Sequence, residues 1–224
     1  MKWAPLPVGA LLFLGAVGLV LAFALLRPGP VIVIGVIVLL FAPGRWWRWR
    51  LRRFRRGVRA IQRGDLTAGR AELETFLDGI ADPERFERIQ PLFNLGKRYS
   101  YRAAALSNLG VAALTAEPGG AAALDLQTAG ARFEEALAVD PGYVQAHYGL
   151  AMVARLTGDT TEAATEAERA LALNPGYLPA RLLLATVRRE RGDVAGADEA
   201  LEPLNRQGKD PEDLMDAFRQ RWPS

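Results

Sequence analysis

The sequence repeats itself at a spacing of 34 residues between 146 and 197. Six identities recur at that spacing, in that Ala146, Leu150, Ala151, Gly158, Asp159 and Ala163 return as Ala180, Leu184, Ala185, Gly192, Asp193 and Ala197. Ala146, Leu150 and Ala151 fall on one face of a first helix, each Gly-Asp pair stands where that helix would end, and Ala163 belongs to the second helix. The period therefore predicts stacked helix-turn-helix units that bury their apolar faces against one another.

The unit from Val144 to Tyr177 resembles a tetratricopeptide repeat (TPR), a family with a period of about 34 residues. Asn174-Pro175 ends its second helix, because the residue before a proline is pushed out of the α region. The resemblance implies an all-α fold, with an α-solenoid of about four TPR-like repeats over residues 50–204. A capping helix is expected in residues 205–224, since the open end of a solenoid needs cover.

The other repeats depart from the regular unit. Residues 50–82 fit a first repeat with Gly64-Asp65 at its turn. The pattern at 121–139 is that of a second helix, so residues 92–116 are predicted to form the one long first helix before it, with a short extra turn at 84–89. Pro203 predicts that the second helix of the last repeat ends early or kinks. Asp210 is the expected N-cap of the final helix, which runs from Pro211 to about Trp222.

Two apolar segments precede the repeats and predict a membrane anchor in residues 1–44. Residues 8–26 carry no charge and approach the roughly 20 residues that cross a bilayer. After the turn at 27–30, residues 31–42 are apolar again, and a second span is predicted over 31–47. Two alternatives stay open: a cleaved secretory signal ending near Ala22-Phe23-Ala24, and a second segment that is re-entrant or interfacial.

A basic collar, residues 45–59, follows the apolar segments and overlaps the first repeat helix. Eleven of the 28 Lys and Arg lie in residues 1–64, which hold none of the 25 Asp and Glu. The positive-inside rule places such a cluster in the cytoplasm, and contact with anionic headgroups explains it better than nucleic acid, because an apolar segment adjoins it. The tryptophans are expected in the interfacial belt. The predicted membrane-surface residues are Arg45, Trp46, Trp47, Arg48, Trp49, Arg50, Arg52, Arg53, Arg55 and Arg56.

The TPR resemblance implies that the first helix of each repeat lines a concave groove for a partner. Arg155 and Arg189 are 34 residues apart and are expected on one wall, where they could hold a carboxylate of the partner; the alternative is that both are surface arginines that serve solubility. The lysine and asparagine clamp of the family is not matched. The predicted groove residues are Gln145, Tyr148, Met152, Arg155, Pro179, Leu182, Thr186 and Arg189.

No arrangement typical of catalysis is present in the sequence. There is no cysteine, and the single histidine, His147, is expected to pack within its repeat. Phosphate-binding, nucleophile-elbow and zinc or calcium motifs are missing, so neither an enzyme nor a cofactor is expected.

The sequence thus predicts a membrane-anchored bacterial-type TPR scaffold. It would recruit or assemble a protein or peptide partner at the cytoplasmic face of the cytoplasmic membrane. The alternative is an envelope assembly factor whose repeats lie outside the cytoplasm, held by one helix or released after signal cleavage.

Overall fold

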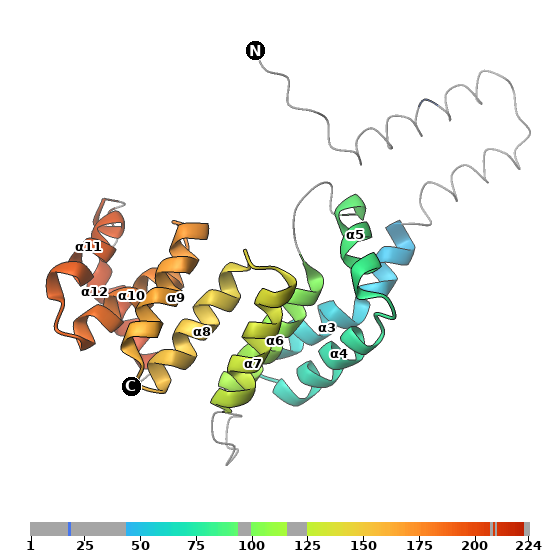
Figure 1. Cartoon of the computed structure of the whole chain (residues 1–224), viewed down its shortest axis with the longest axis horizontal. Coiled ribbons are helices and arrows are strands. Elements are labelled where there is room, and N and C mark those ends of the chain that lie inside the picture. Colours follow the sequence, from blue (N-terminus) through green and yellow to red (C-terminus); the bar gives the residue numbers. More distant parts are fainter. Residues whose placement is uncertain are drawn as a thin grey trace, which may run out of the picture.

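The computed structural model describes residues 18, 44–93, 100–115, 125–206, 208 and 210–221. In these ranges the secondary structure is helical (Figure 1). The helices are α3 (Arg52–Gln62), α4 (Leu66–Asp78), α5 (Pro83–Phe93), α6 (Tyr101–Leu114), α7 (Leu126–Val139), α8 (Val144–Leu156), α9 (Thr160–Leu173), α10 (Leu178–Glu190), α11 (Val194–Asn205) and α12 (Pro211–Arg221).

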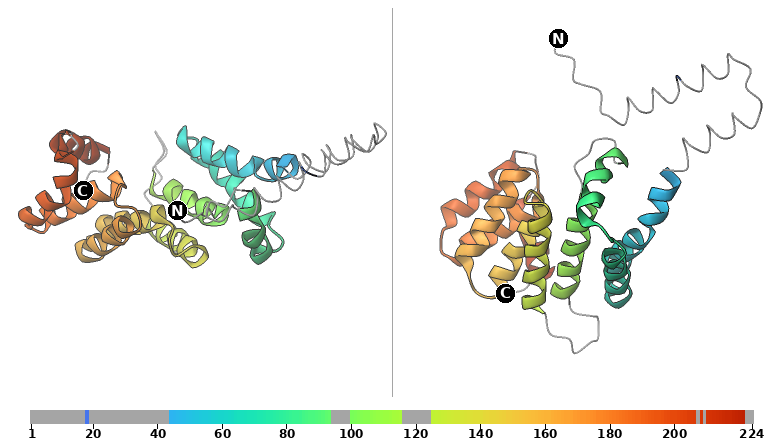
Figure 2. Two further views of the ribbon diagram at one scale, coloured as in Figure 1. Left: turned by 90° about the horizontal axis from the view of Figure 1, so that it is seen from above. Right: turned by 45° about the vertical axis from the view of Figure 1, so that its right-hand side comes forward.

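The helices pack as consecutive hairpins that form a solenoid. The pairs α3–α4, α6–α7, α8–α9 and α10–α11 each make close contact, and neighbouring pairs touch along the array. Figure 2 shows the same succession from two further sides. The predicted all-α repeat fold is therefore observed in the described part of the chain.

A recurring turn joins the two helices of three of these pairs. Gly64, Gly158 and Gly192 adopt φ values of 85°, 87° and 79°, a left-handed conformation that glycine adopts without steric cost. The aspartate that follows each glycine accepts a backbone N–H from the first turn of the next helix, as Asp159 does from Glu162 at 2.9 Å. The repeated Gly-Asp pair thus reverses the chain and caps the second helix.

Small residues allow the helices to approach closely in the core. Ala146, Ala163 and Ala180 are fully buried at the contacts between helices. The largest fully buried side chain, Phe133 of α7, lies against Gly110 of α6 and Gly149 of α8. A Cβ added at Gly149 would come within 2.4 Å of the Phe133 ring. This ring therefore fixes the spacing between two successive pairs.

The N-terminal end of the described solenoid corrects one prediction. Residues 44–50 are helical and lead into α3, with the Leu51 N–H donating to the Trp47 carbonyl at 3.0 Å. Trp47 is only 4% exposed and stacks on Phe86 of α5, with ring centroids 5.3 Å apart. Trp47 is therefore a core residue of the solenoid, and the prediction that it lies in a membrane interface and ends a second span is wrong.

The predicted spans 8–26 and 31–47 lie outside the described residues, except at Gly18 and at 44–47. Within the described ranges, no helix combines the length and the apolar character needed to span a bilayer.

The region before α7 also differs from the prediction. Instead of one helix over 92–116, α5 extends to Phe93 with Pro91 inside it, and α6 begins at Tyr101. Ser100 is extended (φ −80°, ψ 112°), and its side chain accepts the Ala103 N–H at 3.0 Å. This serine cap starts α6 as a new helix. The predicted break at 117–120 lies outside the described residues.

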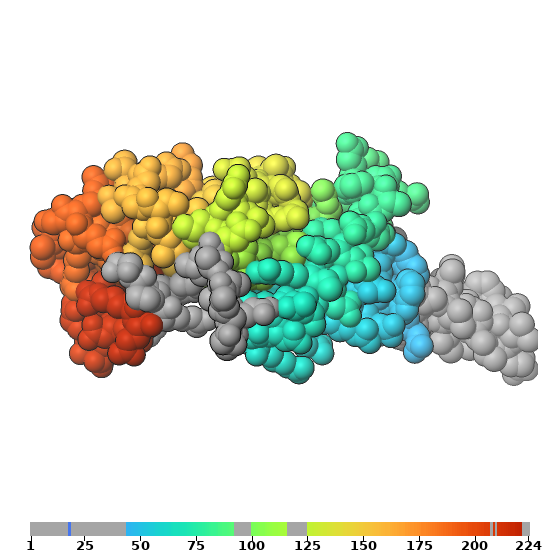
Figure 3. All heavy atoms as spheres, turned by 90° about the horizontal axis from the view of Figure 1, so that it is seen from below, coloured from blue at the N-terminus to red at the C-terminus, as the bar shows by residue number. Residues whose placement is uncertain are grey.

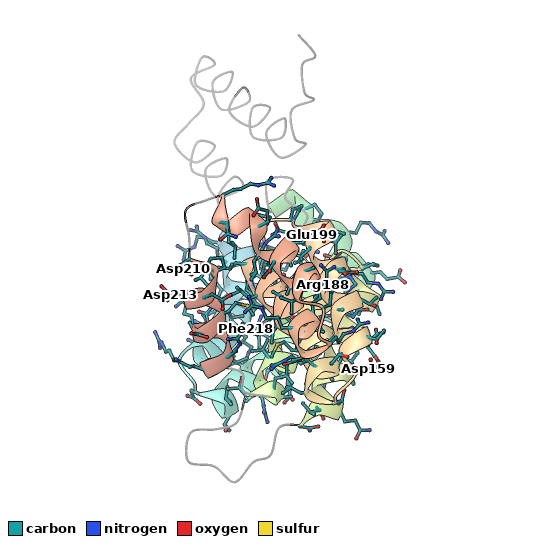
Figure 4. All side chains as sticks on the ribbon, turned by 90° about the vertical axis from the view of Figure 1, so that its left-hand side faces the viewer. Asp159, Arg188, Glu199, Asp210, Asp213 and Phe218 are labelled. Atoms are coloured by element: carbon teal, nitrogen blue, oxygen red, sulfur yellow. The ribbon has the colours of Figure 1, made fainter. Side chains whose placement is uncertain are left out.

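The C-terminal elements agree with the prediction. Pro203 lies in the last turn of α11, which has 12 residues where α9 has 14. Asp210 accepts the Glu212 N–H at 2.9 Å, and α12 then packs against α10 and α11 through Met215 and Phe218. In the view of Figure 4, Asp210 and Asp213 lie at the start of this helix and Phe218 lies farther along it.

Candidate partner-binding site

An apolar hollow of about 440 Å³ lies among five helices, α6, α7, α8, α10 and α12. The helices α6, α8 and α10 are the first helices of successive pairs, so the hollow follows from stacking the repeats. The cap α12 supplies the remaining side of the hollow. Figure 3 shows α12 in red at one end of the array, opposite the blue α3. The lining residues are Val111, Leu114, Phe133, Gln145, Tyr148, Gly149, Met152, Tyr177, Leu178, Pro179, Leu182, Leu214, Ala217 and Phe218.

Five of the predicted groove residues line this hollow: Gln145, Tyr148, Met152, Pro179 and Leu182. Met152 and Leu182 are buried and form its floor, whereas Gln145 is exposed and Tyr148 is half-buried. These five residues therefore lie together in the structure, and their role in partner binding stays a prediction.

The predicted residue Thr186 does not line the hollow. It is buried, and its hydroxyl donates to the Leu182 carbonyl at 2.8 Å and approaches the Met215 sulfur at 3.7 Å. The hydroxyl group thus contributes to the packing of α12 on α10.

Arg155 and Arg189 are occupied by acids of the same chain. Arg155 is buried and donates from Nε and Nη2 to Glu190, at 2.9 and 2.8 Å. Arg189 forms a two-pronged pair with Glu212, with Nη1 3.0 Å from Oε2. Hydrogen bonds from Arg189 lower the pKa of Glu212. The prediction that these arginines hold a partner carboxylate is replaced by internal ion pairs that tie α8 to α10 and α10 to α12.

Sequence reasoning missed the contributions of α6, α7 and α12 to the hollow. Val111 of α6 is 39% exposed, an unusual position for a large apolar residue beside the core. Ala217 and Phe218 belong to α12, which the sequence predicted only as a cap. The apolar stripe of that helix was the available signal, since Leu214 and Phe218 lie on one face at helical spacing.

Two tyrosine side chains line the hollow side by side. Tyr148 and Tyr177 meet edge to face, with ring centroids 5.7 Å apart. Burial raises the pKa of Tyr177, so its phenol is neutral at physiological pH. The hollow therefore offers aromatic faces and hydroxyl groups without a formal charge among its lining residues.

His147 lies beside the hollow and connects two helices. Its Nδ1 is 2.6 Å from Glu166 Oε2, and its Nε2 is 3.1 Å from the Pro141 carbonyl oxygen. Arg53 and Glu72 form a related pair in the first repeat, again 19 residues apart. These contacts agree with the packing role expected for the histidine.

Some collar residues contact other residues of the solenoid, and others are exposed to solvent. Arg53 and Arg56 contact Glu72 of α4, and Arg55 donates to the Arg48 carbonyl. Trp46 and Trp49 are 45% and 64% exposed, in contrast to the buried Trp47. Arg45, Arg48 and Arg52 are exposed as well, and Arg50 is half-buried.

Among the residues the structure describes, no cluster of three or more His, Cys, Asp or Glu side chains is placed to hold a metal ion.

Comparison with known proteins finds a family resemblance in the C-terminal part of the chain. Residues 154–220 match a protein-family model described as "Tetratricopeptide repeat". The matched residues include those of α10 and α12 that line the hollow. The match supports a resemblance to the TPR family for the C-terminal repeats. Such helical arrays present extended surfaces for protein binding.

Among solved structures, the chain is similar to MamA, with 20% identity, a TM-score of 0.41, and coverage of 68% of this chain and 96% of that one. A second MamA structure has 16% identity, a TM-score of 0.39, and coverage of 79% and 97%. A thermophilic TPR protein of Thermus thermophilus has 23% identity, a TM-score of 0.41, and coverage of 77% and 96%. A search of curated proteins found no match.

Proposed function

We propose that this protein is a non-enzymatic TPR-type scaffold that binds a protein or peptide partner in the apolar hollow. The observation that carries the proposal is the composition of the hollow: five helices contribute apolar and aromatic side chains to one open recess. An apolar recess with a few polar groups is the usual form of a site that accepts an anchoring side chain.

The scaffold is proposed to lie at a membrane. Support comes from the sequence, since residues 8–26 and 31–42 are apolar and the arginines follow directly. On this proposal the repeats face the bacterial cytoplasm, and the partner is recruited to the inner surface of the cytoplasmic membrane. The second candidate, an envelope assembly factor with external repeats, rests on the small-x-small sequence Ala22-Phe23-Ala24.

Reporter fusions distinguish the two candidates. Two kinds of reporter are fused after Gly64 and at Ser224: one that is active only inside the cytoplasm and one that is active only outside it. If the repeats face the cytoplasm, only the first kind should be active at both positions. Activity confined to the outside of the cytoplasm would instead support the envelope factor.

Partner binding can be tested by affinity capture from native membranes with the full chain. Ala217 is exposed and lines the hollow, so Ala217→Glu should place a charge in the recess and reduce partner recovery at least tenfold, because an unpaired charge resists desolvation. Gln220→Glu is the matched control, since it adds the same charge to an exposed position of α12 that does not line the hollow. Equal recovery with both variants would contradict binding in the hollow.

A further inference from the structure

A second pocket lies where the helical residues 44–50 and α3 meet the end of α4. Its volume is about 330 Å³, and it is lined on one side by Trp49, Arg50, Arg52 and Arg53 and on the other by Phe76 and Ile80. Both apolar residues are buried in the core. The pocket therefore combines three guanidinium groups with an apolar floor and an exposed indole.

The guanidinium groups differ in how they are held. Arg50 donates to the Gly79 carbonyl at 3.4 Å and lies 5.7 Å from the centre of the Phe86 ring. Arg53 contacts Glu72. Among the described residues, no carboxylate pairs with Arg50 or Arg52 in a salt bridge. The pocket consequently has a net positive charge, even though the C-terminus of α4 contributes a partial negative charge.

Arg50 is the positioned member of this set. The carbonyl of Gly79 and the aromatic ring of Phe86 restrict its guanidinium, so less conformational freedom is lost when it binds a ligand. The planar guanidinium presents paired donors that match phosphate oxygens. Arg52, which is exposed and also lines the pocket, can supply a second set of donors.

We propose that this pocket binds the phosphate-bearing headgroup of one anionic phospholipid. The phosphate would lie between Arg50 and Arg52, and the glycerol and first methylenes would lie against Phe76 and Ile80. The inference deepens the proposed membrane function and rests on it. A lipid is favoured over a nucleic acid because the floor is apolar and the apolar residues 31–42 adjoin the pocket in sequence.

Two exposed tryptophans support the proposal that the pocket faces a membrane surface. Trp49, at the edge of the pocket, is 64% exposed, and Trp46 is 45% exposed. Indole rings concentrate at the headgroup level of a bilayer. A membrane surface that contacts Trp46 and Trp49 would place its headgroups beside Arg50 and Arg52.

The test uses the full chain, freed of lipid and held in detergent micelles. Native mass spectrometry then counts the lipid molecules bound to each protein. The probes are phosphatidylglycerol and phosphatidylcholine with the same acyl chains. We expect one tightly bound phosphatidylglycerol, and at least tenfold weaker binding in the double variant Arg50→Gln with Arg52→Gln, because each arginine near an anionic headgroup contributes appreciably. Arg59→Gln with Arg63→Gln is the matched control, since both residues are exposed and lie outside the pocket.

Several results would overturn the proposal. Equal loss in the two double variants would indicate diffuse attraction by the collar, and equal binding of phosphatidylcholine would show that the negative charge is not recognised. Displacement by glycerol phosphate as effectively as by the intact lipid would assign the pocket to a soluble phosphate. Displacement by a short RNA at lower concentration than the lipid would assign it to nucleic acid.

Failure of the lipid site can be distinguished from failure of the membrane anchor and from failure of partner binding. Extraction of the full chain by alkaline carbonate would refute the membrane anchor, whatever the lipid count. Partner capture through Ala217 should be unchanged in the Arg50→Gln and Arg52→Gln double variant, because the two sites share no lining residue.

Discussion

At the scale of single residues, Gly149 and Phe133 form a close contact between successive helix pairs. A Cβ at Gly149 would approach the Phe133 ring to 2.4 Å, and the ring is fully buried and cannot move away without disturbing its neighbours. Gly149→Ala should therefore lower the free energy of unfolding by about 1–3 kcal/mol, as overpacking of a core does. Urea unfolding followed by circular dichroism measures the change.

Gly130 provides the control for this prediction. It also lies in a helix, but the nearest atom to an added Cβ would be Val153 Cγ1 at 3.8 Å. Gly130→Ala should raise the free energy of unfolding by about 0.5–1 kcal/mol, because alanine loses less backbone entropy in a helix. Equal effects of the two alanine substitutions would contradict the role assigned to Phe133.

Glu87 should make the folded state less stable as pH rises. A carboxylate whose pKa is lowered by an ion pair, such as Glu212, has the opposite effect. Burial raises its pKa above 4.5, despite hydrogen bonds from Ser100 and Gln90 that favour the charged form. The folded state therefore binds the proton more tightly than the unfolded state. The stability that this proton contributes is present below about pH 4.5 and is lost as pH rises through the folded pKa.

The measurement is the free energy of unfolding of the wild type and Glu87→Gln between about pH 4 and pH 7. We expect the wild type to lose stability relative to the variant as pH rises above 4.5, and the difference to level off at higher pH. A difference that is constant over this range would refute the assignment.

The repeat predicts the position of first-helix residues along the array, whereas their role in partner binding stays a prediction. Gln145, Tyr148 and Met152 occupy first-helix positions that any stacked repeat turns toward the hollow. The prediction from the sequence failed for Arg155 and Arg189, because a 34-residue spacing predicts that two side chains lie on the same wall but not which acids face them. Glu190 and Glu212 reach these arginines only through the packing of α10 and α12.

At the scale of elements, α12 is joined to the solenoid by an apolar face and by the ion pair between Arg189 and Glu212. Arg189 lowers the pKa of Glu212 below 4.5, so the contribution of the pair is present above about pH 4.5 and is lost as pH falls through the lowered folded pKa. Glu212 is largely exposed, which limits this contribution to about 1 kcal/mol or less.

Hydrogen exchange of the α12 amides tests this prediction. Glu212→Gln should speed their exchange severalfold at neutral pH, and the difference from the wild type should shrink as the solution is acidified below the usual range of glutamate. An effect that persists unchanged in acid would show that the ion pair is not its cause, and no effect at neutral pH would show that α12 is held by packing alone.

Elements were predictable where sequence signals agree with one another. Gly-Asp pairs and Asp-Pro or Asn-Pro pairs marked the turns of α8 to α11, and the helices begin and end beside them. The region 83–114 misled the prediction because Pro91 is accommodated inside α5, whereas Ser100, a residue without a special sequence context, starts α6. A single capping serine is a weak signal beside a proline.

At the scale of the whole molecule, Trp47 anchors the N-terminal end of the described solenoid. Its ring stacks on Phe86 and meets the edge of Tyr101, with ring centroids 6.1 Å apart. A fragment that starts at residue 44 should therefore be more stable than one that starts at residue 48, by the roughly 3–5 kcal/mol typical of removing a large buried aromatic side chain. Thermal unfolding of the two fragments compares them, and equal stability would contradict the core position of Trp47.

Neither pocket could be predicted as a whole from the sequence, because each is lined by residues that only the packing of the array brings together. The hollow needs Val111 and Ala217, which are more than one hundred residues apart, and the pocket at α3 needs Arg50 beside Ile80. Period and composition predicted the helices and the basic collar. The juxtaposition of distant helix faces depends on Phe133, on α12 and on the buried Trp47, which carry no motif.

The central claim, that the hollow receives a protein partner, is tested most directly by photocrosslinking from within it. A photoreactive residue at Val111 and another at Ala217, each in the full chain in native membranes, should give a covalent product with the same partner, since both positions line the hollow from different helices. Glu162 on α9, which is exposed and outside the hollow, is the control and should give none. Crosslinking from Glu162 alone, or different products from Val111 and Ala217, would contradict the account.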